Sequence, residues 1–173
     1  MASPSEKESE IDMKKIEIFG ANRFETFTKT RLGSRAVIIN DGQILLSHET
    51  KSGWWLLPGG GLEENETPEE CCVREVEEET GYIVSPVHEF LIIYEYYEEY
   101  RYISHYFVCE VIGHGKMDLT ETEKERGIEP QWMPLQKAMD MFSRHQDYAG
   151  ISEEKRGSYL REHTALENLR LSE

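Results

Sequence analysis

The sequence predicts a single α/β domain in which helices cover the faces of a mixed β-sheet. Segments with strand character and segments with helix character are interspersed along the chain, and strands that are neighbours in sequence are often placed to pair. The length of 173 residues fits one domain, and we find no internal repeat or low-complexity linker. We assign residues 14–173 to this domain. The polar segment 1–13 is expected to be a disordered tail or a cloning remnant, with Met13 as an alternative start.

The first half of the chain holds several candidate strands. Ile16–Phe19 could form a short strand. Ala36–Ile39 and Ile44–Leu46 flank Asn40-Asp41-Gly42, a sequence typical of a hairpin turn. Trp54–Leu57 is a short apolar strand that stops at a proline followed by three glycines.

The second half contains a longer hairpin and two helices. Phe90–Tyr97 and Tyr100–Val111 are rich in aromatic and β-branched residues, which favour an antiparallel pair of strands. Gln131–Met133 is a brief strand, and Pro134 then opens a helix. The segment Ser152–Leu171 has helical character.

Composition excludes some classes of function. The net charge of −15 argues against broad contact with a polymeric nucleic acid, which requires clustered Lys and Arg side chains. No apolar run is long enough for a membrane span, so no membrane partner is expected. Cys71, Cys72 and Cys109 lack the spacing of a metal site, and their odd number suits a reducing compartment. We therefore interpret the cysteines as packing residues and the location as cytoplasmic.

The best-marked element is a helix from about Pro68 to Thr80. Thr67 is a favourable N-cap, proline suits the first helical position, and Glu70 completes a capping box. Gly81 stands where a left-handed residue commonly ends a helix.

Helical periodicity gathers three carboxylates of this helix, Glu75, Glu78 and Glu79, in one sector. The neighbouring sector is expected to pack on the sheet, and it holds Cys72, Val73, Val76 and Thr80. Like charges at this spacing oppose helix formation by about 0.2–0.5 kcal/mol per pair, and Arg74, four residues before Glu78, offsets only one of them. A hard divalent cation bound by the carboxylates would explain the arrangement, whereas a solvated acidic face is the alternative.

The residues around this helix resemble the signature of the Nudix hydrolase family. That signature runs Gly, five residues, Glu, seven residues, Arg-Glu, an aliphatic residue, any residue, Glu-Glu, any residue, Gly and an aliphatic residue. Every fixed position is matched here, by Gly60, Glu66, Arg74-Glu75, Glu78-Glu79 and Gly81. The one departure is Tyr82 at the final aliphatic position, a bulky apolar substitute.

The resemblance implies a Nudix fold, an α/β/α sandwich around a mixed sheet, and a Mg²⁺-dependent attack of water on a phosphoanhydride. It implies that Mg²⁺, or Mn²⁺ in its place, is ligated by Glu75, Glu78, Glu79 and the carbonyl of Gly60. Arg74 would orient these carboxylates by salt bridging. Glu66 and Gly81 would support the geometry of the loop and the helix.

A carboxylate must also accept the proton of the attacking water. By resemblance, this base is either a helix residue such as Glu75 or Glu78, or an acid from a later loop. The loop candidates are Glu121, Glu123 and Glu125, and we favour Glu125 from its distance to Trp132. At least two of these three loop acids are expected to be merely solvated.

The substrate is expected to be a small phosphorylated nucleotide. A nucleoside triphosphate or dinucleoside polyphosphate ranks first, and ADP-ribose or a nucleotide sugar ranks next. Arg35 could meet a phosphate, although an exposed position at a strand end is the favoured interpretation. The tyrosines of the second hairpin could stack on a base, although packing within the sheet is more usual. The histidines show no paired metal spacing.

Two other classes of function stay open. A Nudix-fold module could bind a nucleotide without hydrolysing it, although such modules usually lose one of the signature carboxylates. A structural or interaction protein with an acidic face is the third hypothesis. A homodimer is common among such domains.

Overall fold

A computed structural model describes residues 13–169 of the chain. Its centre is an eight-stranded sheet with the order β1-β6-β7-β2-β3-β4, to which β5 adds beside β2 and β8 beside β3. The strands are β1 (Lys15–Phe19), β2 (Lys29–Asn40), β3 (Gln43–Glu49), β4 (Trp54–Leu56), β5 (Gly59–Gly61), β6 (Tyr82–Tyr97), β7 (Tyr100–His114) and β8 (Ile128–Pro134). Residues 1–12 of the predicted tail lie outside the described residues, as does the end of the predicted last helix.

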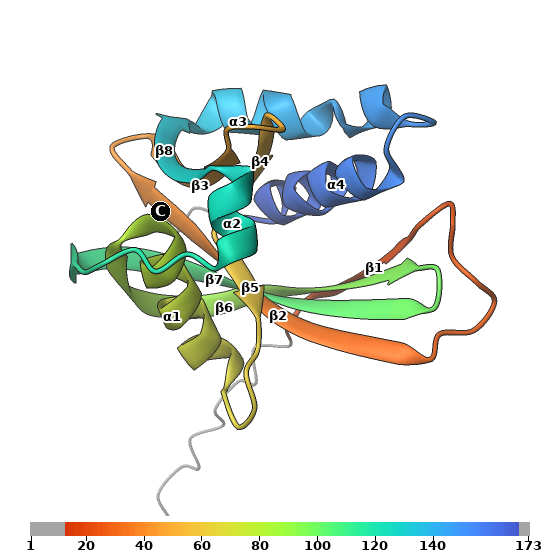
Figure 1. Cartoon of the computed structure of the whole chain (residues 1–173), viewed down its shortest axis with the longest axis horizontal. Helices are drawn as coiled ribbons and strands as arrows, with labels where there is room; N and C mark the ends of the chain where they lie inside the picture. The colour runs from red at the N-terminus through yellow and green to blue at the C-terminus, as the bar shows by residue number, and fades with distance from the viewer. Residues whose placement is uncertain (1–12, 170–173) are drawn as a thin grey trace, which may run out of the picture.

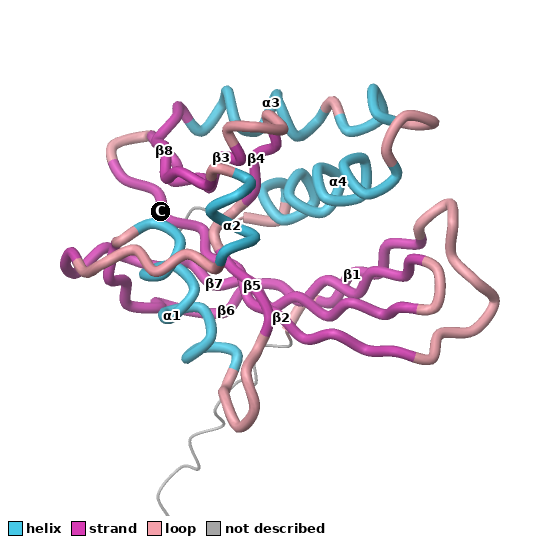
Figure 2. The backbone as a smooth tube through the Cα atoms, in the orientation of Figure 1, coloured by secondary structure: helices cyan, strands magenta, loops and turns pink. Residues whose placement is uncertain are grey.

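Helices lie on both sides of this sheet (Figure 1). The helical elements are α1 (Pro68–Thr80), α2 (Glu121–Arg126), α3 (Leu135–Ser143), η1 (His145–Tyr148) and α4 (Glu153–Glu167). In Figure 2, α1 lies below the sheet and α3 and α4 lie above it, while the short α2 stands at the edge between them. The predicted α/β sandwich is confirmed.

The sheet is mixed. β2 runs parallel to β7, and β1 runs parallel to β6, whereas β6 and β7 form the long antiparallel hairpin expected from their sequence. The β2–β3 hairpin turns at Asp41 and Gly42, which both adopt positive φ. Two successive residues with positive φ are what a tight hairpin turn requires.

Alternation along the central strands divides the core into two clusters. On one face, Val37 of β2 packs in the cluster that includes Phe142 of α3 and Tyr159 of α4. On the other face, Ala36 and Ile38 pack in the cluster that includes residues of α1. Because successive strand residues point to opposite faces, β2 is buried on both sides and reads as a continuous apolar run.

The ends of α1 are as predicted. The hydroxyl of Thr67 accepts a hydrogen bond from the N–H of Glu70, and the Glu70 carboxylate accepts one from the N–H of Thr67. Gly81 ends the helix in the left-handed conformation, with φ of 77°. Local sequence signals therefore predicted the first and the last residue of this helix correctly.

Three segments differ from expectation. β2 begins at Lys29 instead of Ala36, because its N-terminal half pairs with β7 and does not depend on an apolar run. Residues 59–61, expected only to stop a strand, themselves pair antiparallel with β2. The segment that holds Glu121, Glu123 and Glu125 was expected to be a loop. It forms helix α2, with a capping box of its own at Thr120 and Glu123.

The three cysteines are free and buried, as their interpretation as packing residues required. The Sγ atoms of Cys72 and Cys109 lie 3.7 Å apart beneath α1. Among residues 13–169, none of the helices combines the length and the apolar character that crossing a bilayer demands.

Glu153, in the first turn of α4, ties the segment after β1 to the helix and gives a pH-dependent prediction. Its carboxylate accepts hydrogen bonds from Arg156 at 2.7 Å and from the N–H of Ala21 at 3.0 Å. The hydrogen bond from Arg156 lowers the pKa of Glu153. The stabilisation is therefore present above the pKa of the unfolded chain and is lost as pH falls through the folded value.

We expect Glu153→Gln to lower the Tm near neutral pH by at most roughly 2–4 °C, the effect of about 1 kcal/mol. The difference from wild type should shrink as pH falls below the ordinary glutamate pKa of about 4.3, and it should vanish below the lowered folded-state pKa, where the wild-type carboxyl is protonated as well. Thermal unfolding followed by circular dichroism from acid to neutral pH tests this. The exposed Glu154→Gln variant is the control. A difference that stays constant with pH would contradict the assignment.

Candidate functional site

The acidic side of α1 borders a cavity of about 290 Å³ at the junction of the sheet with α2. Its wall is partly backbone, because the glycine strand β5 contributes Gly59, Gly60 and Gly61. The charged side chains that line it come from four elements and are Arg35, Glu49, Glu75, Glu79, Glu123 and Arg126. An adjoining cavity of about 280 Å³ shares Glu75 and Glu123 and adds Glu78 and Asp118.

Glu79 is the most deeply placed of the three predicted carboxylates. Only 8% of it is exposed, and its Oε2 accepts hydrogen bonds from Ser47 Oγ at 2.9 Å and from the N–H of Gly59 at 3.2 Å. Burial raises its pKa to about 8, against the opposing charge of Arg35. A buried carboxylate held only by neutral hydrogen-bond donors is a strong attractor for a cation.

Glu75 lies between the two cavities and touches the glycine strand. A methyl group added at Gly60 would stand 2.5 Å from Glu75 Cδ, so any other residue there would displace this carboxylate from its present place. Burial raises the pKa of Glu75, while Arg74 opposes that shift and the charges of Glu78 and Glu123 add to it. Because the charge of Glu123 raises the pKa of Glu75, Glu123 of α2 lies close enough to interact electrostatically with α1.

Arg74 gathers the acids around it. It makes a bidentate pair with Glu66, with Nε–Oε1 at 2.6 Å and Nη2–Oε2 at 3.0 Å. Its Nη1 atom also donates to Glu75 at 2.9 Å and to Glu78 at 3.1 Å. Glu66 in turn accepts from the N–H of Glu63, which fixes the loop ahead of the helix. The predicted roles of Arg74 as an orienting residue and of Glu66 as a support for the loop fit these contacts.

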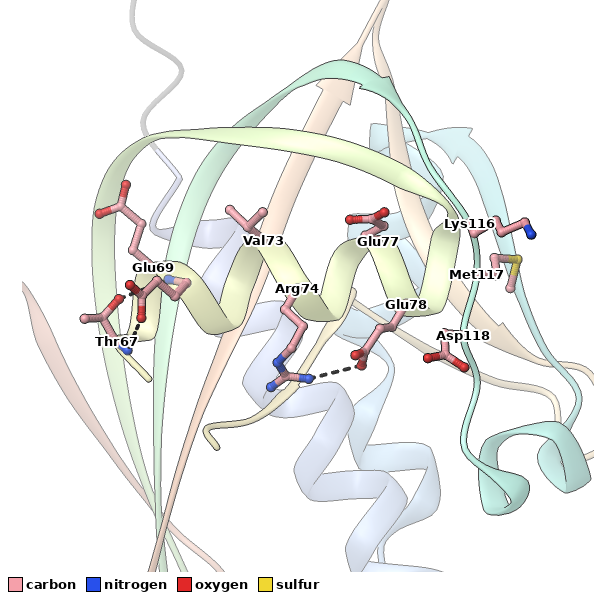
Figure 3. Close-up of a pocket in the computed structure, with 10 residues that line it drawn as sticks. Thr67, Glu69, Val73, Arg74, Glu77, Glu78, Lys116, Met117 and Asp118 are labelled. Carbon is pink, nitrogen blue, oxygen red and sulfur yellow. Dashed lines mark hydrogen bonds and ion pairs between the residues drawn. The ribbon is translucent and has the colours of Figure 1, made fainter. Parts of the chain in front are cut away.

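The outer side of α1 forms a shallow groove along the helix (Figure 3). Val73 and Glu77 line this groove from the helix, and Lys116, Met117 and Asp118 line it from the segment after β7. The expected packing stripe was therefore partly wrong. Val73 is only half-buried, and Cys71 and Glu79 are buried in addition to the predicted Cys72, Val76 and Thr80. The sheet wraps further toward the acidic side of the helix than periodicity alone indicates.

The carbonyl of Gly60 was predicted to join the metal site. In the structure it accepts a weak hydrogen bond from Cys71 Sγ at 3.5 Å, and it lies close to Gly33 of β2. Its role as a ligand stays a prediction. A side chain at Gly60 would stand against Glu75.

The three acids of α2 are not equivalent. Glu123 is half-buried and lines both cavities, whereas Glu121 and Glu125 are exposed and line neither. Our preference for Glu125 relied on counting along a presumed loop. The capped helix changes the outcome, because it turns Glu123 toward α1 and Glu125 away. Geometry therefore favours Glu123 over Glu125 as the acid next to Glu75.

Arg35 is the residue that sequence reasoning undervalued. It lies inside β2, is half-buried and lines the cavity beside Glu79, whereas an exposed strand end was favoured. Its Nη1 donates to the carbonyl of Leu57 at 2.8 Å. The available signal was a lone arginine directly before the apolar run 36–39, which marks a charge carried into a buried strand.

The tyrosines of the β6–β7 hairpin lie apart from the acids of α1. Tyr97, Tyr100 and Tyr102 line a separate cavity of about 340 Å³ between the hairpin and α4. The rings of Tyr100 and Tyr102 stack on each other at 5.5 Å, and Tyr106 is fully buried in the core. This agrees with the packing interpretation. Among the histidines, His48 stacks on Trp55 with ring centroids 3.7 Å apart.

Within residues 13–169, no three His, Cys, Asp or Glu side chains come close enough to form a ready-made metal cluster. The contacts of the α1 acids give the reason. Arg74 draws Glu75 and Glu78 toward itself, while Ser47 and Gly59 hold Glu79. The arginine thus acts as an internal counter-ion for the acidic sector.

A family model described as the NUDIX domain matches residues 29–153, well over half of the chain. The matched segment includes the glycine strand, α1 with its three carboxylates, and α2. The chain belongs to the NUDIX domain family, as the signature predicted.

Individual relatives are more distant. An uncharacterised Nudix hydrolase of Bacillus subtilis (strain 168) is 39% identical over 54 residues, which cover 31% of this chain and 34% of the relative. Another protein of that strain, provisionally named 8-oxo-dGTP diphosphatase, is 32% identical over 105 residues, covering 60% of this chain and 69% of the relative. The chain spans about a third of the length of the first curated relatives that it matches.

A solved structure, the NUDIX hydrolase from Nitrosomonas europaea, superimposes with a TM-score of 0.54 at 21% identity. The superposition covers 82% of this chain and 93% of that one. At this level of identity it shows a shared fold.

The glycine strand gives a prediction about stability. A methyl group at Gly59 would stand 2.1 Å from the carbonyl oxygen of Ser34 and 2.8 Å from Arg35 Cα, both of them backbone atoms that cannot easily move. At Gly61 the nearest atom would be 3.8 Å away. We expect Gly59→Ala to lower the free energy of unfolding by roughly 1–3 kcal/mol or more, and Gly61→Ala to leave it nearly unchanged. Urea unfolding of both variants measures this, and equal losses would show that β5 does not approach β2 so closely.

Proposed function

We propose that this chain is a magnesium-dependent hydrolase that cleaves a phosphoanhydride bond in a small nucleoside-diphosphate-linked substrate. One observation carries the proposal. Glu79 is a buried carboxylate with a raised pKa, held only by neutral donors and facing a cavity that Glu75 and Glu123 also line. A structural role alone would favour a side chain that cannot ionise at this position, because burial disfavours the ionised carboxyl more strongly than the charge of Arg35 favours it.

The residues present fit a hard divalent cation. Carboxylate oxygens are the ligands that Mg²⁺ prefers, and the proposed ligands are Glu75, Glu78 and Glu79. Gly60 leaves room for the carboxylate of Glu75, and the N–H of Gly59 donates to the carboxylate of Glu79. When bound there, Mg²⁺ or Mn²⁺ would acidify the attacking water, neutralise phosphate oxygens and stabilise the leaving oxygen.

The chain's own residues supply the remaining chemistry. Glu123 faces Glu75 across the cavity, and we assign it to accept the proton of the attacking water. Arg35 and Arg126 line the same cavity and are placed to bind phosphate oxygens. Arg74 would release part of its hold on Glu75 and Glu78 when a cation takes its place, while its bidentate pair with Glu66 keeps it docked.

The substrate class follows from the charges of the site. Two arginines and a cation suit a linear chain of two or more phosphates. A nucleoside triphosphate stands first, supported by the name of the Bacillus subtilis relative provisionally called an 8-oxo-dGTP diphosphatase. Dinucleoside polyphosphates stand beside it, followed by ADP-ribose and nucleotide sugars. The buried free cysteines support the proposed cytoplasmic location.

A non-catalytic nucleotide-binding module is the second candidate. It would need the same cavity and arginines but no proton acceptor. The half-buried Glu123 beside Glu75 favours catalysis over this alternative.

Replacing the buried carboxylate should separate activity from stability. At pH 7 the raised pKa of Glu79 means that its carboxyl must take up a proton when the chain folds without a cation, and Glu79→Gln removes this cost. The Tm at pH 7 should therefore be unchanged or higher, while turnover should fall by orders of magnitude. Glu77→Gln, on the same helix but facing only the outer groove, should retain turnover. The assay is a panel of nucleotides with Mg²⁺ or EDTA, reading phosphate release with and without added phosphatase. Normal turnover of Glu79→Gln, or turnover in EDTA, would refute the proposed metal site.

The proton acceptor is tested by comparing two acids of one short helix. Glu123→Gln should lower kcat by about 10²–10⁴-fold, the range for loss of a general base, whereas Glu125→Gln should leave kcat within twofold of wild type. Because both substitutions change the net charge of α2 equally, Glu125→Gln controls for long-range electrostatics. The reverse ranking would restore Glu125 as the base.

A further inference from the structure

The outer edge of strand β4 donates main-chain hydrogen bonds to side chains of helix α4. Among the described strands, β4 pairs with β3 alone, which leaves its other edge without a strand partner. On that edge the N–H of Trp55 donates to Tyr159 Oη at 3.3 Å, and the N–H of Leu57 donates to Glu162 Oε2 at 2.6 Å. Tyr159 and Glu162 lie three residues apart, on one face of α4. Side chains of a helix thus replace the missing neighbour strand.

Glu162 is an unusual choice for a structural partner. It is completely buried, and its second oxygen accepts hydrogen bonds from Tyr106 Oη at 2.7 Å and Arg161 Nε at 2.9 Å. Burial alone would raise the pKa of Glu162, but the charges of Arg161 and Arg35 outweigh it, and the pKa is lowered. The carboxylate is therefore ionised and has donors on both oxygens.

The peptide groups that Glu162 holds lead directly into the glycine strand. The N–H of Leu57 is fixed by Glu162, and its carbonyl accepts from Arg35 at 2.8 Å. The next carbonyl, that of Pro58, accepts from the N–H of Ala36 at 2.9 Å. The following N–H, that of Gly59, donates to Glu79. Three successive residues are thus fixed from α4, β2 and α1.

We propose that Glu162 is a positioning residue that fixes the Leu57 peptide and so sets Gly59 and Gly60 against the carboxylates of Glu79 and Glu75. Its kinetic consequence rests on the function proposed above. Glu162 has no contact with the cavity of the α1 acids, since it lies on the other side of β4 and acts through the main chain. A displacement of the glycine strand by a fraction of an ångström would change the room available to Glu75 and the hydrogen bond from Gly59 to Glu79.

A merely structural explanation is that Glu162 neutralises Arg161. Glu95 already performs that task in part, since it is buried and lies 3.5 Å from Arg161 Nη1. Buried ion pairs are also often replaceable by apolar residues without loss of stability. What distinguishes Glu162 from Glu95 is the hydrogen bond to Leu57. These two glutamates therefore form a matched pair for an experiment.

The central variant is Glu162→Gln in the full chain. A glutamine has one oxygen, and the Arg161 and Tyr106 donors compete for it, so its amide group is turned toward the N–H of Leu57 and that hydrogen bond is lost. We expect kcat to fall by about 10–100-fold and the Mg²⁺ concentration for half-maximal activity to rise by a similar factor, as for loss of groups that orient metal ligands. KM should stay within twofold, because no substrate contact is removed.

Glu95→Gln is the control, since it removes a buried charge from Arg161 but leaves Leu57 untouched. Its kcat and Mg²⁺ dependence should stay within twofold of wild type. If Glu162→Gln does not fold, Glu162→Asp serves in its place, because aspartate keeps the charge but is one methylene too short to reach Leu57. Values for either Glu162 variant within twofold of wild type, or an equal loss in Glu95→Gln, would overturn the proposal.

Two readouts do not depend on turnover. The Leu57 amide should exchange slowly with solvent in wild type and in Glu95→Gln, and measurably faster in Glu162→Gln, as followed by NMR. Binding of Mn²⁺, measured by electron paramagnetic resonance, should weaken only in the Glu162 variant. If wild type binds Mn²⁺ but hydrolyses no nucleotide, the proposed function fails while these readouts still decide the positioning role. An unchanged Leu57 amide in Glu162→Gln would refute it.

Discussion

The close approach of α1 to the glycine strand β5 is the constraint on which the site depends. A side chain at Gly59 would meet the backbone of β2, and one at Gly60 would meet the carboxylate of Glu75. Without this approach, the N–H of Gly59 could not reach Glu79, and the acidic side of the helix would face open water. Burial then follows from the backbone. The carboxylates are partly dehydrated because a strand without side chains lies against them, which strengthens every electrostatic interaction in the cavity.

Arg74 shows how the chain tolerates its own acidity. With a net charge of −15, the protein places one guanidinium, of which 22% of the side chain is exposed, among Glu66, Glu75 and Glu78. The bidentate geometry toward Glu66 is specific to arginine, and lysine could not reproduce it while reaching the other two acids. This arrangement also explains why the acids of α1 are not gathered into a tight cluster. Glu75 and Glu78 share Arg74, whereas Glu79 is held apart from them by Ser47 and Gly59.

Sequence reasoning succeeded where local chemistry decides the structure. The capping box at Thr67 and Glu70 and the left-handed Gly81 fixed both ends of α1, and the signature residues fixed the family. Sequence reasoning failed where contacts between distant segments of the chain decide the structure. The parallel pairing of Lys29–Ile38 with β7 has no local pattern, so Arg35 was placed at a strand end. The orientation of Glu123 followed from a short capped helix that had been taken for a loop. The contact between Glu162 and Leu57 joins residues far apart in sequence and has no signature.

The parallel pairing of β2 with β7 has a consequence for the order of folding. Lys29 pairs with Tyr100, and the glycine strand, α1 and β6 lie between them in sequence. During synthesis, β2 can therefore pair with β7 only after these segments and most of β7 have been synthesised. Pairings between such distant segments are slow, because the entropy of closing a long loop is lost before the contacts form. The hairpin and the capped helix are local and can form early. The cavity, which needs β2, β5, α1 and α2 together, is then among the last features to be assembled on a growing chain.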